Sequence, residues 1–296
     1  MARVRAAGWA GGAVLALGLV AQPPSTARAA DEPSLTLPGS TLTAVTVDLD
    51  GDAAREVVRL RGDGPASSVL EVWAHDGATW SMTDEVATEP IRIADGSPAD
   101  SQGIGLLRWT HAGGEELVLV TAATDVSGST FPSPCCLAFS MLERAGRGYR
   151  IVGVPGGGGS GDAAMVVDLD GDGTDEIVTQ RTVVLSDTDP GTLELDVHRW
   201  SDGRFETMQR LSSPVAYGVL PAETDGRPGD ELLLYGTLDG SLVRYAFRDG
   251  AVVAEETPLG TADRGDAFLG GVADGLIVVN GSQTASVVRW PADGPA

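Results

Sequence analysis

The nine residues from Asp168 to Glu176 carry carboxylates at a spacing that is typical of a calcium-binding loop. Acidic side chains stand at the first, third, fifth and ninth positions of this stretch. Calcium takes about six to eight oxygen ligands, and a tightly curled loop lets alternate side chains reach one point. Gly173, at the sixth position, permits the sharp turn, and Thr174, at the seventh, would offer its main-chain carbonyl oxygen. We therefore expect Ca²⁺ to be held by Asp168, Asp170, Asp172, Thr174 and Glu176.

A second stretch, from Asp48 to Glu56, repeats this pattern with one departure. The sixth position is Ala53 instead of glycine, and an alanine in the left-handed conformation costs about 1–2 kcal/mol. We expect a second calcium site here, weaker than the site in the Asp168 loop. Its ligands would be four carboxylates and one main-chain carbonyl, from Asp48, Asp50, Asp52, Glu56 and Ala54.

Short apolar runs flank the Asp168 loop on both sides, at residues 164–167 and 177–179. Runs of this length are typical of buried strands, whereas a helix–loop–helix calcium site needs helical periodicity, which neither flank has. A strand, an acidic loop and a second strand resemble the FG-GAP/VCBS repeat, the blade unit of propellers such as the head of the integrin α-chain. The resemblance extends from about residue 34 to the end of the chain and is specific at the two acidic loops. It implies a β-propeller with a role in binding or adhesion.

Two landmarks recur in step along the chain. An acidic residue followed by an apolar run begins at Glu56, Glu116, Glu176 and Glu231, at intervals of 60, 60 and 55 residues, with a degraded copy at Gly275 a further 44 residues on. An Asp-Gly dipeptide between alternating apolar runs follows four of these five copies, at residues 76–77, 202–203, 249–250 and 293–294, and residues 145–148 replace it in the second copy. Asp-Gly in this setting predicts a tight hairpin, because both turn positions need φ > 0.

The landmarks predict four antiparallel strands in each unit: one before the loop, one after it and a hairpin. Such units bury their faces by stacking around an axis, so we expect an all-β fold, a β-propeller of five four-stranded blades. It would form one domain over residues 30–296. The last unit ends shortly after its Asp-Gly, without a fourth strand, and we expect residues 34–38 to supply that strand and close the ring. Six blades or an open ring is the alternative.

The remaining units have lost the acidic pattern to different degrees. In the fourth unit, Arg227 stands at the fifth position of residues 223–231, and we expect it to pair with Glu223 and Asp225 in place of an ion. The second unit, at residues 108–116, has lost the acids at the first, third and fifth positions. Two intact loops among five units indicate that the metal stabilises blades and takes no part in chemistry.

The N-terminal residues 1–29 have the features of a signal peptide. Arg3 and Arg5 precede an apolar stretch at residues 10–21, and Ala27-Arg28-Ala29 fits a cleavage site. The apolar stretch is short for a bilayer crossing, and a retained anchor is the alternative. We expect a secreted, monomeric protein without stable membrane insertion.

The net charge of the chain limits the classes of molecule that it is expected to bind. Acidic residues outnumber basic ones by 42 to 20, and the net charge is −22. Such a surface disfavours nucleic acids and anionic membranes as partners and favours divalent cations.

Candidate catalytic residues are sparse. His75, His111 and His198 fall in different units and share no spacing that zinc or a nucleophilic triad needs. Cys135 and Cys136 are adjacent and form either a vicinal disulfide or two thiols. Five tryptophans are expected to pack between blades, with sugar stacking as the alternative: Trp73, Trp80, Trp109, Trp200 and Trp290.

These observations predict a secreted, non-catalytic module, stabilised by calcium, that binds a protein or glycan ligand. We expect no catalytic residues. The alternative is a secreted polysaccharide-degrading enzyme of lyase type, with its site in the funnel of the propeller. Convergence of acids, histidine or tyrosine at that funnel would distinguish the two.

Overall fold

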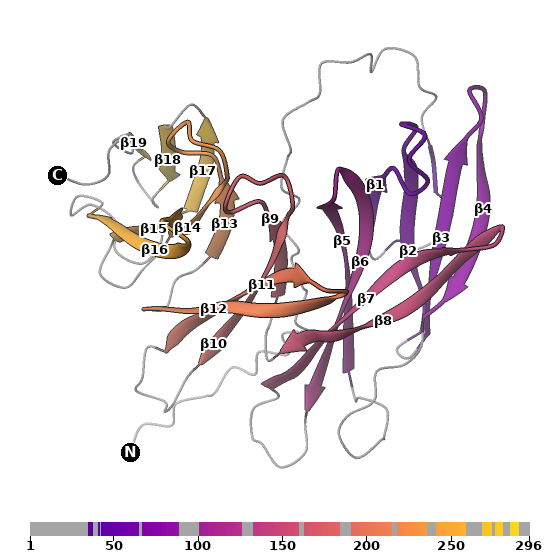
Figure 1. Cartoon of the computed structure of the whole chain (residues 1–296), viewed down its shortest axis with the longest axis horizontal. Helices are drawn as coiled ribbons and strands as arrows, with labels where there is room; N and C mark the ends of the chain where they lie inside the picture. The colour runs from indigo at the N-terminus through magenta and orange to yellow at the C-terminus, as the bar shows by residue number, and fades with distance from the viewer. Residues whose placement is uncertain are drawn as a thin grey trace, which may run out of the picture.

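The computed structural model contains five antiparallel β-sheets, and no helix occurs among the residues it describes (Figure 1). These residues are 35–37, 41, 43–64, 67–88, 101–125, 133–159, 163–183, 191–214, 218–235, 241–258, 268–273, 276–280 and 285–289. In this part of the chain, no helix has the length and hydropathy that a bilayer crossing requires. The expected signal peptide, residues 1–29, lies outside the described residues, as does Trp290.

Each sheet is built from consecutive strands that lie side by side in chain order. Sheet 1 contains β1 (Thr43–Val47), β2 (Glu56–Gly64), β3 (Ser67–His75) and β4 (Trp80–Ala87). Sheet 2 contains β5 (Ser101–His111), β6 (Gly114–Asp125), β7 (Ser133–Ala145) and β8 (Gly148–Gly159). Sheet 3 contains β9 (Ala163–Val167), β10 (Glu176–Val183), β11 (Thr192–Ser201) and β12 (Arg204–Pro214). Sheet 4 contains β13 (Gly218–Ala222), β14 (Glu231–Tyr235), β15 (Ser241–Arg248) and β16 (Ala251–Pro258).

Sheet 5 has three strands: β17 (Phe268–Ala273), β18 (Leu276–Asn280) and β19 (Ala285–Arg289). The prediction of four antiparallel strands per unit is therefore confirmed for four units, and the fifth lacks its fourth strand within the described residues. Residues 35–37, the described part of the expected closing strand, are not assigned to a strand. Ring closure and the number of blades stay predictions.

The turn chemistry anticipated from the sequence holds at two of the hairpins. Asp202 and Gly203 have φ of 51° and 81°, and Asp249 and Gly250 have φ of 51° and 89°. Asp76 differs, because it begins a four-residue connection in which its Oδ1 accepts the N–H groups of Ala78 and Thr79, at 2.9 and 2.8 Å. The prediction of a two-residue turn with two positive φ angles was therefore wrong there, and a side chain caps the turn instead.

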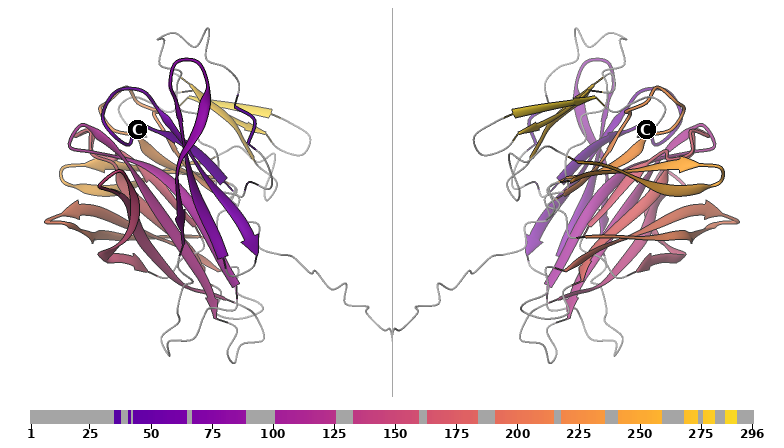
Figure 2. Two further views of the ribbon diagram at one scale, coloured as in Figure 1. Left: turned by 90° about the vertical axis from the view of Figure 1, so that its right-hand side faces the viewer. Right: turned by 90° about the vertical axis from the view of Figure 1, so that its left-hand side faces the viewer.

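Successive sheets lie against one another. The first strands β1, β5, β9 and β13 are neighbours in that order, and so are the fourth strands β4, β8 and β12. In Figures 1 and 2 sheets 1 to 4 follow one another in chain order as overlapping layers. Repeated sheets packed in series are consistent with blades.

Three hydrophobic clusters fill the spaces between these sheets. The cluster between sheets 1 and 2 includes Val58, Leu60, Leu117 and Leu119; that between sheets 2 and 3 includes Trp109, Val118, Phe139, Ile177 and Phe205; that between sheets 3 and 4 includes Val178, Leu195, Leu232 and Tyr245. Neighbouring residues of one strand thus face different clusters, because side chains alternate along a strand. This burial on both faces explains the continuous apolar runs of the second strands.

Aromatic rings dominate the contact between sheets 2 and 3. Trp109 lies with its ring centroid 5.3 Å from that of Trp200 and 5.2 Å from that of Phe205. Trp109 and Trp200 therefore pack between neighbouring sheets, as expected for tryptophans between repeat units.

The connections between first and second strands also join neighbouring sheets. In sheets 2 and 4 a residue at or beside the start of the second strand contacts the preceding sheet: Glu115 Oε2 accepts the N–H of Asp48 at 3.0 Å, and the N–H of Asp230 donates to the carbonyl of Asp168 at 2.7 Å. Between sheets 2 and 3, Asp175 Oδ2 accepts the N–H of Thr110 at 2.6 Å, and the Asp175 carbonyl accepts the Trp109 indole N–H at 2.6 Å.

Gly171 shows how closely two of these connections approach. A Cβ placed on Gly171, whose φ is 74°, would lie 2.5 Å from the carbonyl carbon of Pro228 in sheet 4. Gly51 is its counterpart in sheet 1, with φ of 77° and nothing within 4 Å of such a Cβ. The two glycines therefore share a backbone conformation and differ in their surroundings.

We predict that Gly171→Ala destabilises the protein more than Gly51→Ala. Both variants incur the cost of a left-handed alanine, about 1–2 kcal/mol. Gly171→Ala adds the overlap with Pro228, for which we expect about 1–3 kcal/mol more. Urea unfolding of both variants measures the difference, and equal losses would contradict the contact between sheets 3 and 4.

Candidate metal centre

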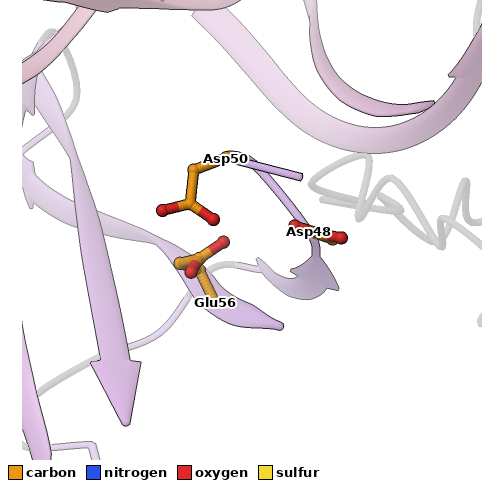
Figure 3. A group of neighbouring side chains, drawn as sticks. All are labelled: Asp48, Asp50 and Glu56. Atoms are coloured by element: carbon orange, nitrogen blue, oxygen red, sulfur yellow. The ribbon is translucent and has the colours of Figure 1, made fainter. Parts of the chain in front are cut away.

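Three acidic groups lie at equivalent places, each between the first and second strand of a sheet. In each group, one carboxylate oxygen from every member lies within 4.8 Å of the others. The groups are Asp48, Asp50 and Glu56; Asp168, Asp170 and Glu176; and Glu223, Asp225 and Glu231. Figure 3 shows the first group, in which the carboxylates of Asp50 and Glu56 point toward each other. The structure therefore brings together three of the four acids expected in each calcium loop.

Hydrogen bonds within the Asp168 loop fix its curl. Asp168 accepts the N–H groups of Gly171 and Gly173, at 2.8 and 3.0 Å, through separate oxygens. Glu176 Oε2 accepts the N–H of Leu169 at 3.0 Å, which ties the start of β10 to the start of the loop. Asp170 Oδ1 accepts the N–H of Asp172 at 3.2 Å.

The acid at the fifth loop position also accepts a backbone N–H group. Asp172 is exposed, and its Oδ1 accepts the N–H of Thr174 at 2.7 Å. Asp172 and Thr174 therefore lie on the loop as expected, outside the tightest group of carboxylates.

The Asp48 loop has the same five hydrogen bonds at the same positions. Glu56 Oε2 accepts the N–H of Leu49 at 2.9 Å, and Ala53 donates its N–H to Asp48 at 3.0 Å. The other three bonds join Gly51 to Asp48, Asp52 to Asp50 and Ala54 to Asp52. Ala53 has φ of 69°, close to the 83° of Gly173. The expected left-handed alanine is present, and the backbones of the two loops are alike.

The donor set suits a hard cation. In both loops the acids at the third, fifth and ninth positions use one oxygen for a backbone N–H and keep the second oxygen for another partner. Carboxylate oxygens on a curled loop are the ligands that calcium prefers. In the Asp168 loop, the positively charged guanidinium of Arg199 contacts two of these second oxygens. It donates to Asp170 Oδ2 and, at 3.0 Å, to Glu176 Oε1.

The glutamate at the ninth position of each loop is buried, so its ionised form carries a large desolvation cost. Glu176 is 1% exposed and Glu231 is 2% exposed. Burial raises the pKa of Glu176 to about 7, against the opposing effects of the Leu169 N–H and Arg199. Burial likewise raises the pKa of Glu231 to about 7, against its bonds to Thr224. A positive charge beside either carboxylate offsets this cost.

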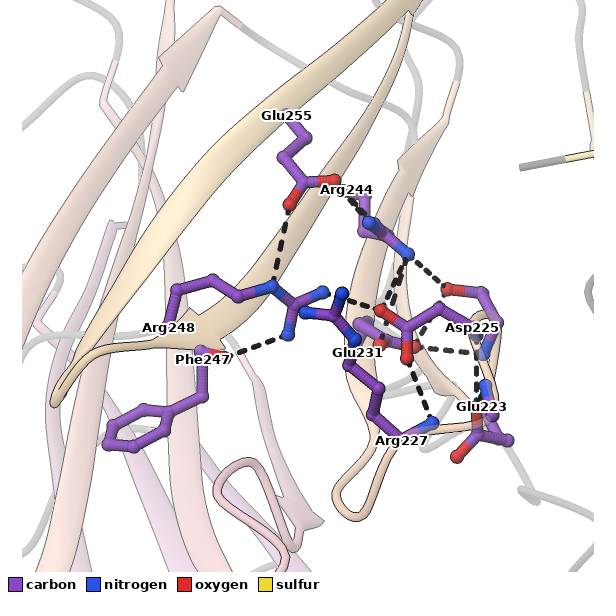
Figure 4. A network of polar contacts seen from close by, with 10 residues as sticks. Glu223, Asp225, Arg227, Glu231, Arg244, Phe247, Arg248 and Glu255 are labelled. Carbon is purple, nitrogen blue, oxygen red and sulfur yellow. Dashed lines mark hydrogen bonds and ion pairs between the residues drawn. The ribbon is translucent and has the colours of Figure 1, made fainter. Parts of the chain in front are cut away.

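In the loop of sheet 4, two arginines occupy the place of a metal (Figure 4). Arg248 donates to Asp225 Oδ2 at 2.5 Å, and the Arg244 Nη1 lies 3.3 Å from the same oxygen and 3.9 Å from Glu231 Oε1. Arg244 is 1% exposed and also pairs with Glu255.

The expected partner of these acids was therefore wrong. Arg227 is exposed, and within the described residues no ion pair joins its side chain to Glu223 or Asp225. Its backbone N–H donates to Asp225 Oδ1 at 3.0 Å. Guanidinium groups do lie beside these acids, but they belong to arginines on β15, the third strand, and not to the neighbour in sequence.

In sheet 2 a two-residue turn replaces the loop. β5 and β6 are joined by Ala112 and Gly113, with φ of 50° and 79°. Glu116 lies opposite Trp109 in the ladder, and burial raises its pKa. The predicted loss of this metal loop corresponds to a shortened connection.

The histidines lie in separate surroundings. His198 is buried between the hydroxyls of Thr179 and Thr207, at 3.2 and 3.1 Å. His111 stacks on Trp109 with ring centroids 4.8 Å apart, and His75 lies 5.2 Å from Trp80. The side chains of Cys135 and Cys136 lie outside the described residues, so their pairing stays open.

No model of a known protein family matches the chain, and no curated protein matches it with significant similarity. The likeness to FG-GAP/VCBS repeats therefore depends on the motifs of the sequence.

We predict that Arg244→Gln and Arg227→Gln have very different effects, although both remove one positive charge. Arg244→Gln removes a buried positive charge that Asp225, Glu231 and Glu255 share, while Arg248 stays beside Asp225 and Glu255. We expect a loss of about 3–5 kcal/mol in the free energy of unfolding. Arg227→Gln alters an exposed side chain, for which we expect less than about 0.5 kcal/mol. Denaturant unfolding measures both losses. A large loss of stability in Arg227→Gln would show that Arg227 is the partner of the acids, as the sequence predicted.

Proposed function

We propose that the chain is a secreted, non-catalytic β-propeller, stabilised by calcium, that presents its loops to a protein or glycan ligand. The observation that carries the proposal is the repetition of one acidic loop, with the same five hydrogen bonds, in sheets 1 and 3. A loop repeated in this way at the edge of packed sheets serves the architecture, whereas a catalytic site is expected once.

Calcium would be held by the carboxylates at the first, third, fifth and ninth loop positions and by the carbonyl at the seventh. The ion would supply positive charge beside a buried glutamate and tie the first strand to the second. Because Asp48 and Asp175 also bond to neighbouring sheets, an ordered loop supports the packing of one blade on the next. The positive-to-negative balance of the chain, 20 to 42, agrees with a cation as ligand and disfavours polyanions.

The buried ion pair of Arg59 and Glu71 supports a structural role for buried charge over a catalytic one. Arg59, 1% exposed, pairs with Glu71 at 2.5 Å, and Glu71 also accepts from Arg61 and from the Trp73 indole. Such pairs stabilise the charged forms and leave little reactivity: the partners of Glu71 hold its pKa below the usual value against the effect of burial. A polysaccharide-cleaving activity remains the alternative to be tested.

We predict that the protein binds two calcium ions and is stabilised by them. An excess of about 1,000 times Kd contributes about 4 kcal/mol per site, so EGTA is expected to lower the melting temperature. Asp50→Asn and Asp170→Asn each remove one ion, because the amide keeps a hydrogen-bond acceptor and loses the charge. Glu223→Gln, in the loop with two arginines, is the control and leaves two ions bound. An unchanged melting temperature in EGTA, with metal removal verified, would contradict the calcium sites.

We predict that the calcium-loaded protein binds a ligand and does not turn over polysaccharides. Arrays of glycans and of extracellular proteins test the first point, with the double variant Asp50→Asn/Asp170→Asn as a control for dependence on calcium. Incubation with polyuronides, followed by the ultraviolet absorbance of unsaturated products, tests the second. Product formation would establish the lyase alternative, and a complete lack of retention on both arrays would contradict a binding module.

A further inference from the structure

Arg199 contacts the two oxygens that a cation in the Asp168 loop would need. Its guanidinium donates to Asp170 Oδ2 and to Glu176 Oε1. The other oxygens of these two carboxylates accept backbone N–H groups, from Asp172 and Leu169, and so are already used by the loop itself. A guanidinium and a calcium ion at this position therefore compete for the same pair of oxygens.

The strand register shows that the third strand of sheet 1 carries no arginine at the position that Arg199 occupies in sheet 3. The ladder between β10 and β11 pairs Ile177 with His198, so that Arg199 lies opposite Glu176. The ladder between β2 and β3 pairs Val57 with Trp73, so that Ala74 lies opposite Glu56.

The equivalence of these positions has independent support. A register shift occurs at Val197/His198 against β12 and at Val72/Trp73 against β4, which is the same place in both sheets. Alanine thus stands in sheet 1 where arginine stands in sheet 3.

The arginine that faces Asp50 in the Asp48 loop differs from Arg199 in reach and exposure. Arg144 Nη1 lies 3.7 Å from Asp50 Oδ2, reaches it from sheet 2 and has a side chain that is 58% exposed. An exposed pair at this distance is screened by solvent and is worth little. Arg199 is less exposed, at 36%, and contacts a carboxylate that is 1% exposed.

We propose that Arg199 is a built-in competitor for calcium in the Asp168 loop, so that the Asp48 loop fills first as the calcium concentration rises. The inference depends on the proposed calcium binding. From Gly173 and Ala53 alone, the Asp168 loop is expected to bind calcium more tightly than the Asp48 loop, and the inference reverses this order of affinity. The backbones of the two loops have the same hydrogen bonds, so the strain at Ala53 lowers folding stability, whereas Arg199 has to leave its carboxylates when the ion binds.

The test isolates the Asp168 loop by removing the other site with Asp50→Asn and Glu56→Gln. In this background, calcium titration by calorimetry compares intact Arg199 with Arg199→Gln. We expect Kd to fall at least about tenfold in the variant, equivalent to about 1.4 kcal/mol. Arg210→Gln is the matched control: it removes the same charge from the same sheet, and Arg210 pairs with Asp196, at 2.6 Å, away from the loop. We expect less than a twofold change there.

A second variant keeps the test decisive if Arg199→Gln does not fold. Arg199→Lys retains a charge but lacks the planar fork that reaches two carboxylates at once, and we expect an intermediate Kd. Calcium affinities of both Arg199 variants that equal or fall below that of Arg210→Gln would overturn the inference. Calcium binding in the protein with both loops intact would then leave the proposed function standing, whereas its absence from every protein tested would overturn the proposed function itself.

Discussion

A buried carboxylate at the start of the second strand is the constraint on which the acidic loops depend. Glu56, Glu176 and Glu231 are 7%, 1% and 2% exposed, and an ionised carboxylate buried without a partner costs several kcal/mol. One oxygen of each is satisfied by the N–H of the residue at the second loop position. The other oxygen requires a positive charge nearby. The three loops differ in which cation supplies this charge.

The three loops differ in how a positive charge is placed beside the buried glutamate. The loop of sheet 4 uses Arg244 and Arg248, and its fifth position has lost the acid. The loop of sheet 3 keeps all its acids and has one arginine, Arg199. The loop of sheet 1 keeps its acids and is approached by an exposed arginine from the next sheet. Under the proposed calcium binding, a metal ion would neutralise the same pair of oxygens that a guanidinium contacts in sheets 3 and 4.

The sequence was sufficient for features that are local in the chain. The four strands of the first four units and the Asp202 and Asp249 hairpins follow from apolar runs and turn residues a few positions apart. The partners of the acids did not follow, because they come from the third strand, and only the ladder register places Arg199 opposite Glu176. The choice of Arg227 was wrong for the same reason: it is the arginine adjacent in sequence, whereas Arg244 and Arg248 reach Asp225 from the third strand.

The position of the loops suggests how a cation would act beyond its own ligands. Asp168 accepts two N–H groups of its own loop through its side chain and the N–H of Asp230, in the next sheet, through its carbonyl. A charge that orders the Asp168 carboxylate therefore also fixes the carbonyl on which sheet 4 depends. Gly171, packed on Pro228, belongs to the same contact. Because this hydrogen bond and this contact join adjacent loops, order in one loop would support its neighbour. Under the proposed function, a ligand surface composed of several loops would gain its shape from calcium without any contact between the ion and the ligand.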